Sequence, residues 1–94
     1  MTTVNYGFII TRDHFDRTVR RLVGPKNTAL HADNLIAQGV PFRLLDGNRR
    51  LCYEGMYLGC ERFRHSPLDD FGEYRAGCTI IQYPDHVTQT WADL

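Results

Sequence analysis

The 94-residue sequence has no long apolar run and no net charge. A helix that spans a bilayer needs about 20 mainly apolar residues, and no run of that length is present. The segment Met1–Asn5 has neither the basic nor the apolar part of a secretory signal, which predicts a cytoplasmic protein. The absence of a basic excess argues against general coating of nucleic acid.

Cysteine is scarce and its spacing is wide. The odd number of cysteines, Cys52, Cys60 and Cys78, excludes a fully paired set of disulfides within one chain and favours reduced thiols. No two cysteines have the close spacing of a structural zinc site, so we do not expect one built from these thiols with His65 and His86. The sequence contains no recognisable cofactor-binding motif, and the pattern of a phosphate-binding loop is also missing.

The composition that remains is that of one globular domain covering residues 1–94. Hydrophobic residues make up 43 % of the chain and charged residues 23 %, a balance that argues against disorder. Domains commonly contain about 100–150 residues, so a second one is not expected. Basic residues dominate the first half of the chain and acidic residues the second, which suits a two-signed surface for a protein partner.

The N-terminal half predicts one strand and two helices. Residues 4–11 alternate as a strand that places Tyr6, Phe8 and Ile10 on one face. Residues 14–23 show helical spacing of apolar residues after a capping Asp13. A second, shorter helix is expected over residues 28–38, with Thr28 as its cap and Gly39 following its end at the C′ position.

The C-terminal half predicts a hairpin, a loop and a last strand. Residues 41–58 contain an Asp-Gly step between two β-prone runs, which is a strong hairpin signal because Gly accepts a positive φ. Residues 59–76 are expected to form a long loop, and residues 77–83 a final strand ended by Pro84. Trp91 is expected to fold back as an apolar plug. The fold class is therefore α+β, a small, mainly antiparallel four-stranded sheet with one or two helices packed on one face.

Short motifs follow one another in the second half of the chain. They are Phe42-Arg43-Leu44, Asp46-Gly47, Tyr53-Glu54-Gly55, Pro67-Leu68-Asp69-Asp70-Phe71-Gly72 and Gly77-Cys78-Thr79, with Ile81 and Tyr83. This pattern resembles small proteins encoded on bacterial phages, plasmids and other mobile elements, a group that includes many anti-CRISPR inhibitors. The resemblance implies a non-enzymatic protein that acts in the cytoplasm of the bacterial host, where it binds a CRISPR effector complex and blocks it. It brings no catalytic residues.

The leading hypothesis is therefore an inhibitor that binds a protein or ribonucleoprotein complex. Its acidic residues would meet an Arg/Lys-lined groove of the partner, and an arginine cluster would form a second contact patch. The predicted partner-binding residues are Glu54, Glu61, Asp69, Asp70, Glu73, Asp85, Arg17, Arg20 and Arg21.

Two other functions remain open from the sequence. The arginine cluster, with Tyr53 and Tyr57 as stacking platforms, fits a small nucleic-acid-binding accessory or regulatory protein of a mobile element. Cys78, paired with His65 or His86 and Asp69 or Asp70, fits a small hydrolase. The adjacent Asp69 and Asp70, with Glu73, also have the residue types of an acid–base or metal site, although the same segment has strong turn propensity.

Overall fold

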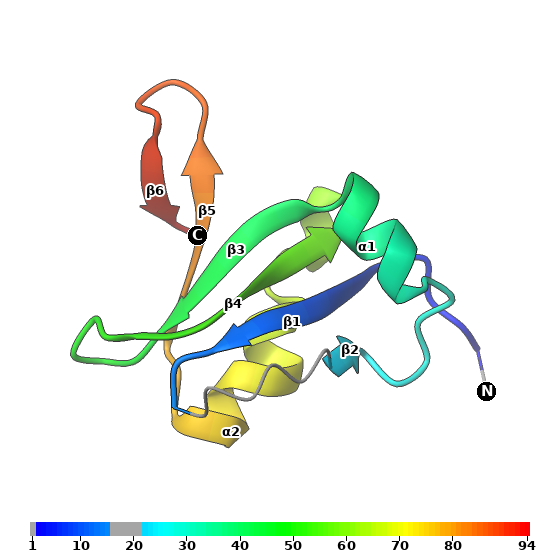
Figure 1. Ribbon diagram of the computed structural model, residues 1–94, viewed down its shortest axis with the longest axis horizontal. Helices are drawn as coiled ribbons and strands as arrows, with labels where there is room; N and C mark the ends of the chain where they lie inside the picture. Colours follow the sequence, from blue (N-terminus) through cyan, green and yellow to red (C-terminus); the bar gives the residue numbers. More distant parts are fainter. Residues whose placement is uncertain (1, 16–21) are drawn as a thin grey trace.

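The computed structural model describes residues 2–15 and 22–94. Within these residues the strands form one six-stranded, fully antiparallel sheet in the order β2-β1-β4-β3-β5-β6 (Figure 1). The α+β class is confirmed, but the sheet is larger than the expected four strands. The elements are β1 (Gly7–Asp13), β2 (Leu22–Gly24), α1 (Ala32–Gln38), β3 (Val40–Leu45), β4 (Leu51–Leu58), η1 (Glu61–Phe63), η2 (Leu68–Gly72), α2 (Glu73–Ala76), β5 (Ile80–Asp85) and β6 (Thr90–Asp93).

One face of the sheet, here called the core face, carries the hydrophobic core. Successive strand residues point to opposite faces, so Phe8 and Ile10 share the core face as predicted, with Tyr6 packed against them. Tyr53 and Tyr57 lie on the same face and are 6 % and 2 % exposed, so they serve the core and are not stacking platforms for bases. The opposite face of the sheet is called the open face below.

Helix α1 covers one end of the open face and not the core face. Its Leu35 is fully buried, as is Ile9, whose side chain points away from the core-face residues of β1. The predicted helix is confirmed in position but begins at Ala32, with His31 as its N-cap. The Thr28 hydroxyl instead donates to the Tyr6 carbonyl at 2.6 Å and accepts from the Leu30 N–H at 3.2 Å. The expectation that the helices pack on one face is therefore wrong.

The predicted helix 14–23 is contradicted at its C-terminal end. Leu22–Gly24 form β2, which pairs with β1 through Ile10 and Phe8. A Cβ at Gly24 would clash with the Phe8 ring, so the close approach of β2 to β1 at this point requires glycine. His14 and Phe15, at the start of the expected helix, are not helical, and residues 16–21, including Arg17, Arg20 and Arg21, lie outside the described residues. Asp13 ends β1, and its Oδ1 accepts a bond from the Phe15 N–H at 2.8 Å.

The predicted hairpin is confirmed as β3 and β4, but its turn differs in detail. Asp46 Oδ1 accepts bonds from the N–H groups of Asn48 and Arg50, each at 2.9 Å. The residue with positive φ is Arg49, at 61°, and not Gly47. The bond from the Arg50 N–H is the main cause that lowers the pKa of Asp46 below its usual value.

The expected loop 59–76 is helical over most of its length, which corrects that prediction. After η1, residues 66–76 form one helical segment that passes through η2, a π-helical turn, into α2. Phe71 and Gly72 are buried against the core face, and Gly77 ends the segment with a φ of 63°. Gly77 is thus a helix cap and not the start of the final strand. This stretch is called the 66–76 segment below.

The C-terminal residues form a hairpin that stands out from the rest of the sheet (Figure 1). Strand β5 runs to Asp85, so Pro84 does not end it: it pairs with Trp91 of β6. Trp91 is half-buried beneath Arg43, whose guanidinium lies 4.6 Å from the ring centroid. The expected plug is therefore part of an outer strand.

Candidate functional site

The carboxylates of the open face are paired with basic side chains. Glu54 Oε2 lies 2.9 Å from His14 Nε2 and 3.7 Å from Arg12 Nη1. At the other end, both oxygens of Asp93 accept bonds from Arg49, at 3.1 and 3.2 Å. The Arg49 bonds, with a further bond from Gln82, lower the pKa of Asp93. These charges are balanced within the fold.

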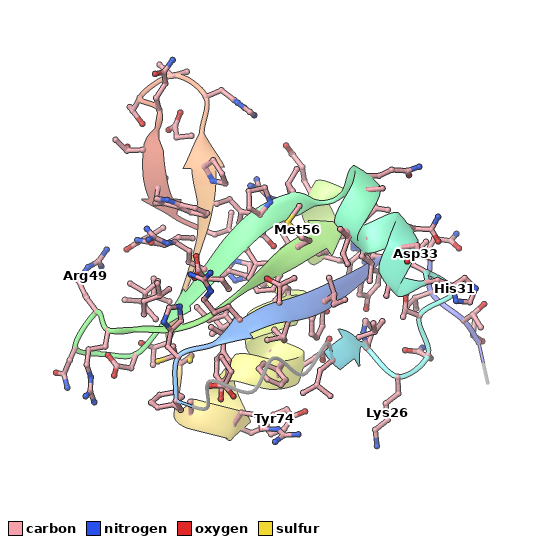
Figure 2. The ribbon with its side chains drawn as sticks, in the orientation of Figure 1. Lys26, His31, Asp33, Arg49, Met56 and Tyr74 are labelled. Atoms are coloured by element: carbon pink, nitrogen blue, oxygen red, sulfur yellow. The ribbon has the colours of Figure 1, made fainter. Side chains whose placement is uncertain are left out.

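The outer side of the 66–76 segment carries carboxylates without that balance. Asp69, Asp70 and Glu73 are exposed, and Asp70 accepts a bond from the Ser66 hydroxyl at 2.5 Å. None of the three forms a salt bridge with a basic residue in the described part of the chain. Tyr74 is 72 % exposed and projects from the outside of α2 (Figure 2). We call these four residues the acidic face.

An aromatic row connects the core to the surface near this segment. Phe71 contacts Tyr53 edge to face, with 4.8 Å between ring centroids, and Tyr53 contacts Phe15 at 5.8 Å. Phe15 is 62 % exposed. The Arg75 guanidinium lies 5.6 Å from the Phe71 ring centroid. The segment is therefore anchored by its inner side, while its outer side is available for contact.

A groove separates β3 from the β5–β6 hairpin. Its volume is about 590 Å³, and its floor includes Tyr57, Tyr83 and Arg64. Both tyrosine hydroxyls are used inside the protein: Tyr57 donates to the Cys60 carbonyl at 2.7 Å, and Tyr83 to the Arg64 carbonyl at 2.6 Å. Burial raises the pKa of Tyr57 to about 12.

Two prolines explain why this groove opens. Strands β3 and β5 pair from Leu45↔Ile80 to Arg43↔Gln82 and then separate. Continued by two residues, the same register would place Pro41 opposite Pro84. A bonded antiparallel pair exchanges two N–H···O bonds, and neither proline has an N–H. The ladder stops at this point, and the strands diverge around the groove.

The structure divides the predicted acidic residues among three places. Glu54 lies on the open face, in the ion pairs described above. Glu61 and Asp85 line the groove. Asp69, Asp70 and Glu73 form the acidic face. The six predicted acidic contact residues therefore do not make one patch, and the three predicted arginines lie outside the described residues. The groove itself was missed by sequence reasoning, although the two prolines were its signal.

The thiol of the proposed hydrolase is poorly placed for nucleophilic chemistry. Cys78 is 1 % exposed and Cys52 is fully buried, and both belong to the core. Burial, with the neighbouring Cys52, raises the pKa of Cys78 far above its usual value. A nucleophilic cysteine needs the opposite shift. Among the described residues, no three His, Cys, Asp or Glu side chains gather in a way that suits a metal ion.

Comparison of this chain with protein-family models, curated proteins and solved structures finds no match. In the part of the chain that the structure describes, no helix has the length and apolar character needed to cross a membrane.

Proposed function

We propose that this domain is a non-enzymatic inhibitor that binds a macromolecular complex through its acidic face. The observation that carries the proposal is the set of exposed carboxylates of Asp69, Asp70 and Glu73, which have no basic partner in the described residues and lie beside the exposed Tyr74. The motif resemblance to mobile-element proteins suggests the class of target, a CRISPR effector complex.

The chemistry of the acidic face suits a groove lined with arginine and lysine. Carboxylates presented together attract such a surface over a distance and accelerate association. A solvent-exposed tyrosine supplies a rigid, amphipathic contact of the type enriched among the strongest contributors to protein interfaces. The inner side of the segment is packed on the core, so the acidic face is presented on a fixed support. An effector groove that normally holds nucleic acid would be blocked by such an occupant.

The test is an affinity pulldown of the tagged protein from a bacterial lysate that contains an active CRISPR system. One half of the lysate is treated with nuclease. We expect capture of effector subunits in both halves, and loss of at least about 100-fold in affinity for the Asp69→Lys/Asp70→Lys variant, since each reversal replaces an attraction with a repulsion.

Asp33→Lys is the charge-matched control for the single reversal Asp69→Lys. Asp33 is exposed in the first turn of α1, on another part of the molecule (Figure 2). The control should bind normally, and circular dichroism should show the same fold for each variant. Equal binding by the Asp69 and Asp33 reversals would contradict the proposal.

The alternative function, nucleic-acid binding, is an outcome of the same experiment. It predicts that the captured material is nucleic acid, disappears after nuclease treatment and weakens steeply with salt. Arg20→Glu/Arg21→Glu should then abolish capture, whereas Asp69→Lys/Asp70→Lys should strengthen it. That pattern would replace the inhibitor hypothesis.

A further inference from the structure

We propose that the groove between β3 and the β5–β6 hairpin is a second binding site, which takes an extended peptide segment bearing apolar and basic side chains. This site is separate from the acidic face and does not depend on the function proposed for it. Its volume of about 590 Å³ falls within the usual range for binding pockets.

The walls of the groove present apolar side chains to solvent. Val40 is 45 % exposed, Leu94 is 47 % exposed and Val87, on the β5–β6 turn, is 92 % exposed. Scattered exposed apolar residues are ordinary, but these three converge on one hollow with Pro41 and Pro84. Covering them with apolar side chains of a ligand would remove apolar surface from water.

The main-chain edges of the groove offer hydrogen-bond acceptors at the two prolines, while its donors lie in the side chains of Gln38, Arg64 and His86. Pro41 and Pro84 contribute carbonyl oxygens to the diverging strand edges but no N–H groups. The floor tyrosines have already committed their hydroxyl donors, as described above. A ligand that lies between the strands must therefore supply donors, which main-chain N–H groups of an extended segment do.

The charges at the groove favour a basic occupant. Glu61, Asp85 and Asp93 contribute carboxylates, and Asp93 is already paired with Arg49, which leaves Glu61 and Asp85 for a ligand. Asp85 Oδ1 accepts from the Val87 N–H at 2.8 Å, which holds the turn and keeps this carboxylate in place. On the basic side, the Arg64 guanidinium stacks 4.2 Å above the Tyr83 ring, and His86 lines the groove. A phosphate-rich ligand would meet the two carboxylates, whereas lysine or arginine side chains would pair with them.

Selection from random nonapeptides displayed on phage tests this site with the intact protein as bait. We expect the selected peptides to be enriched in apolar residues together with lysine or arginine. Amide shifts on titrating one synthetic selected peptide should concentrate at Val40, Leu58, Val87 and Leu94. Selection of acidic peptides, shifts confined to the acidic face, or no enrichment over a blank surface would each overturn the inference.

Two matched charge reversals separate this site from the acidic face. Glu61→Lys should lower the affinity for the selected peptide by roughly tenfold, because it replaces attraction of the peptide's basic side chains with repulsion. Glu73→Lys should leave peptide affinity unchanged while it weakens capture of the effector complex. Both residues are exposed, so neither change should unfold the domain. If Glu73→Lys lowered the affinity for the peptide and Glu61→Lys left it unchanged, the inference would be contradicted. The function proposed for the acidic face would not be affected by that result.

Discussion

The open face of the sheet and the acidic face of the 66–76 segment both carry carboxylates, but they differ in how those charges are balanced. On the sheet, Glu54 lies beside Arg12 of the neighbouring strand β1, and Asp93 pairs with Arg49 of the β3–β4 turn. On the segment, Asp69 and Glu73 have no such partner among the described residues. The difference shows that the charges of the first set are paired within the fold, while those of the second have no basic partner in the part of the chain that the structure describes.

The comparison follows from geometry. Side chains on adjacent strands lie about 5 Å apart, so opposite charges that face each other pair readily. On the outer side of a helical segment, charged side chains can pair along the turn only with residues three or four positions away. Asp69, Asp70 and Glu73 form no such salt bridge among the described residues.

Removing the anchor of the 66–76 segment should have the largest effect. Phe71→Ala deletes a ring that is 7 % exposed and packed on Tyr53, so we expect a loss of about 3–5 kcal/mol in the free energy of unfolding. Tyr74→Ala, on the outer side of the same segment, should change it by less than about 0.5 kcal/mol. Urea unfolding followed by circular dichroism measures both. Equal losses in the free energy of unfolding would show that the inner and outer sides of the segment do not differ in their contribution to stability.

The pairing of Asp93 should give a smaller, pH-dependent effect. Its pKa in the folded state lies below the ordinary value of 3.8, chiefly because Arg49 donates to it. The folded state therefore binds fewer protons than the unfolded state near this pH, so the stabilisation is complete above 3.8 and lost as the pH falls through the lowered pKa.

The variant Asp93→Asn tests this sign. It should be less stable than the wild type at neutral pH, and the difference should shrink in acid as the wild-type carboxylate is protonated. Thermal unfolding from pH 7 downward measures the difference. If the difference in stability between the wild type and the variant stayed constant down to acid pH, the ion pair would make no contribution to the free energy of unfolding.

Neutralising the acidic face should have the smallest effect on stability. Asp69→Asn/Glu73→Gln removes two like charges one turn apart without losing a salt bridge to any described residue, so we expect the free energy of unfolding to stay the same or rise by about 0.2–0.5 kcal/mol. Glu54→Gln is the matched change on the open face and should lower it by about 0.2–1 kcal/mol. Destabilisation of the double variant beyond that of Glu54→Gln would show that the acidic face serves the fold.

Local sequence signals predicted the parts of the fold that depend on neighbours in the chain. The β3–β4 hairpin follows from its Asp-Gly turn, and the side-chain alternation of β1 follows from Phe8 and Ile10. The 66–76 segment was missed because Pro67, Asp69 and Asp70 also favour turns. The helical conformation is favoured by the packing of Phe71 and Gly72 on strands that are distant in the sequence. That packing cannot be read from the local sequence.

The candidate site was predictable in composition but not in arrangement. The acidic residues of the 66–76 segment could be named because carboxylates are rarely buried without a partner. Their separation from Glu61 and Asp85 depends on the path of the chain between η1 and β5. The groove required knowing that Pro41 and Pro84 occupy opposing positions, and that register is set by pairs far apart in sequence.

The early end of the β3–β5 ladder also bears on how the molecule moves. Only three residue pairs join β5 to β3, whereas four pairs hold β5 and β6 together within the described residues. Amide groups open in cooperative units whose cost depends on the contacts that each unit makes with the rest of the protein. We therefore expect the C-terminal hairpin to open as such a unit at a lower free-energy cost than global unfolding. A ligand seated beside Pro41 and Pro84 would raise that cost and slow amide exchange throughout the hairpin.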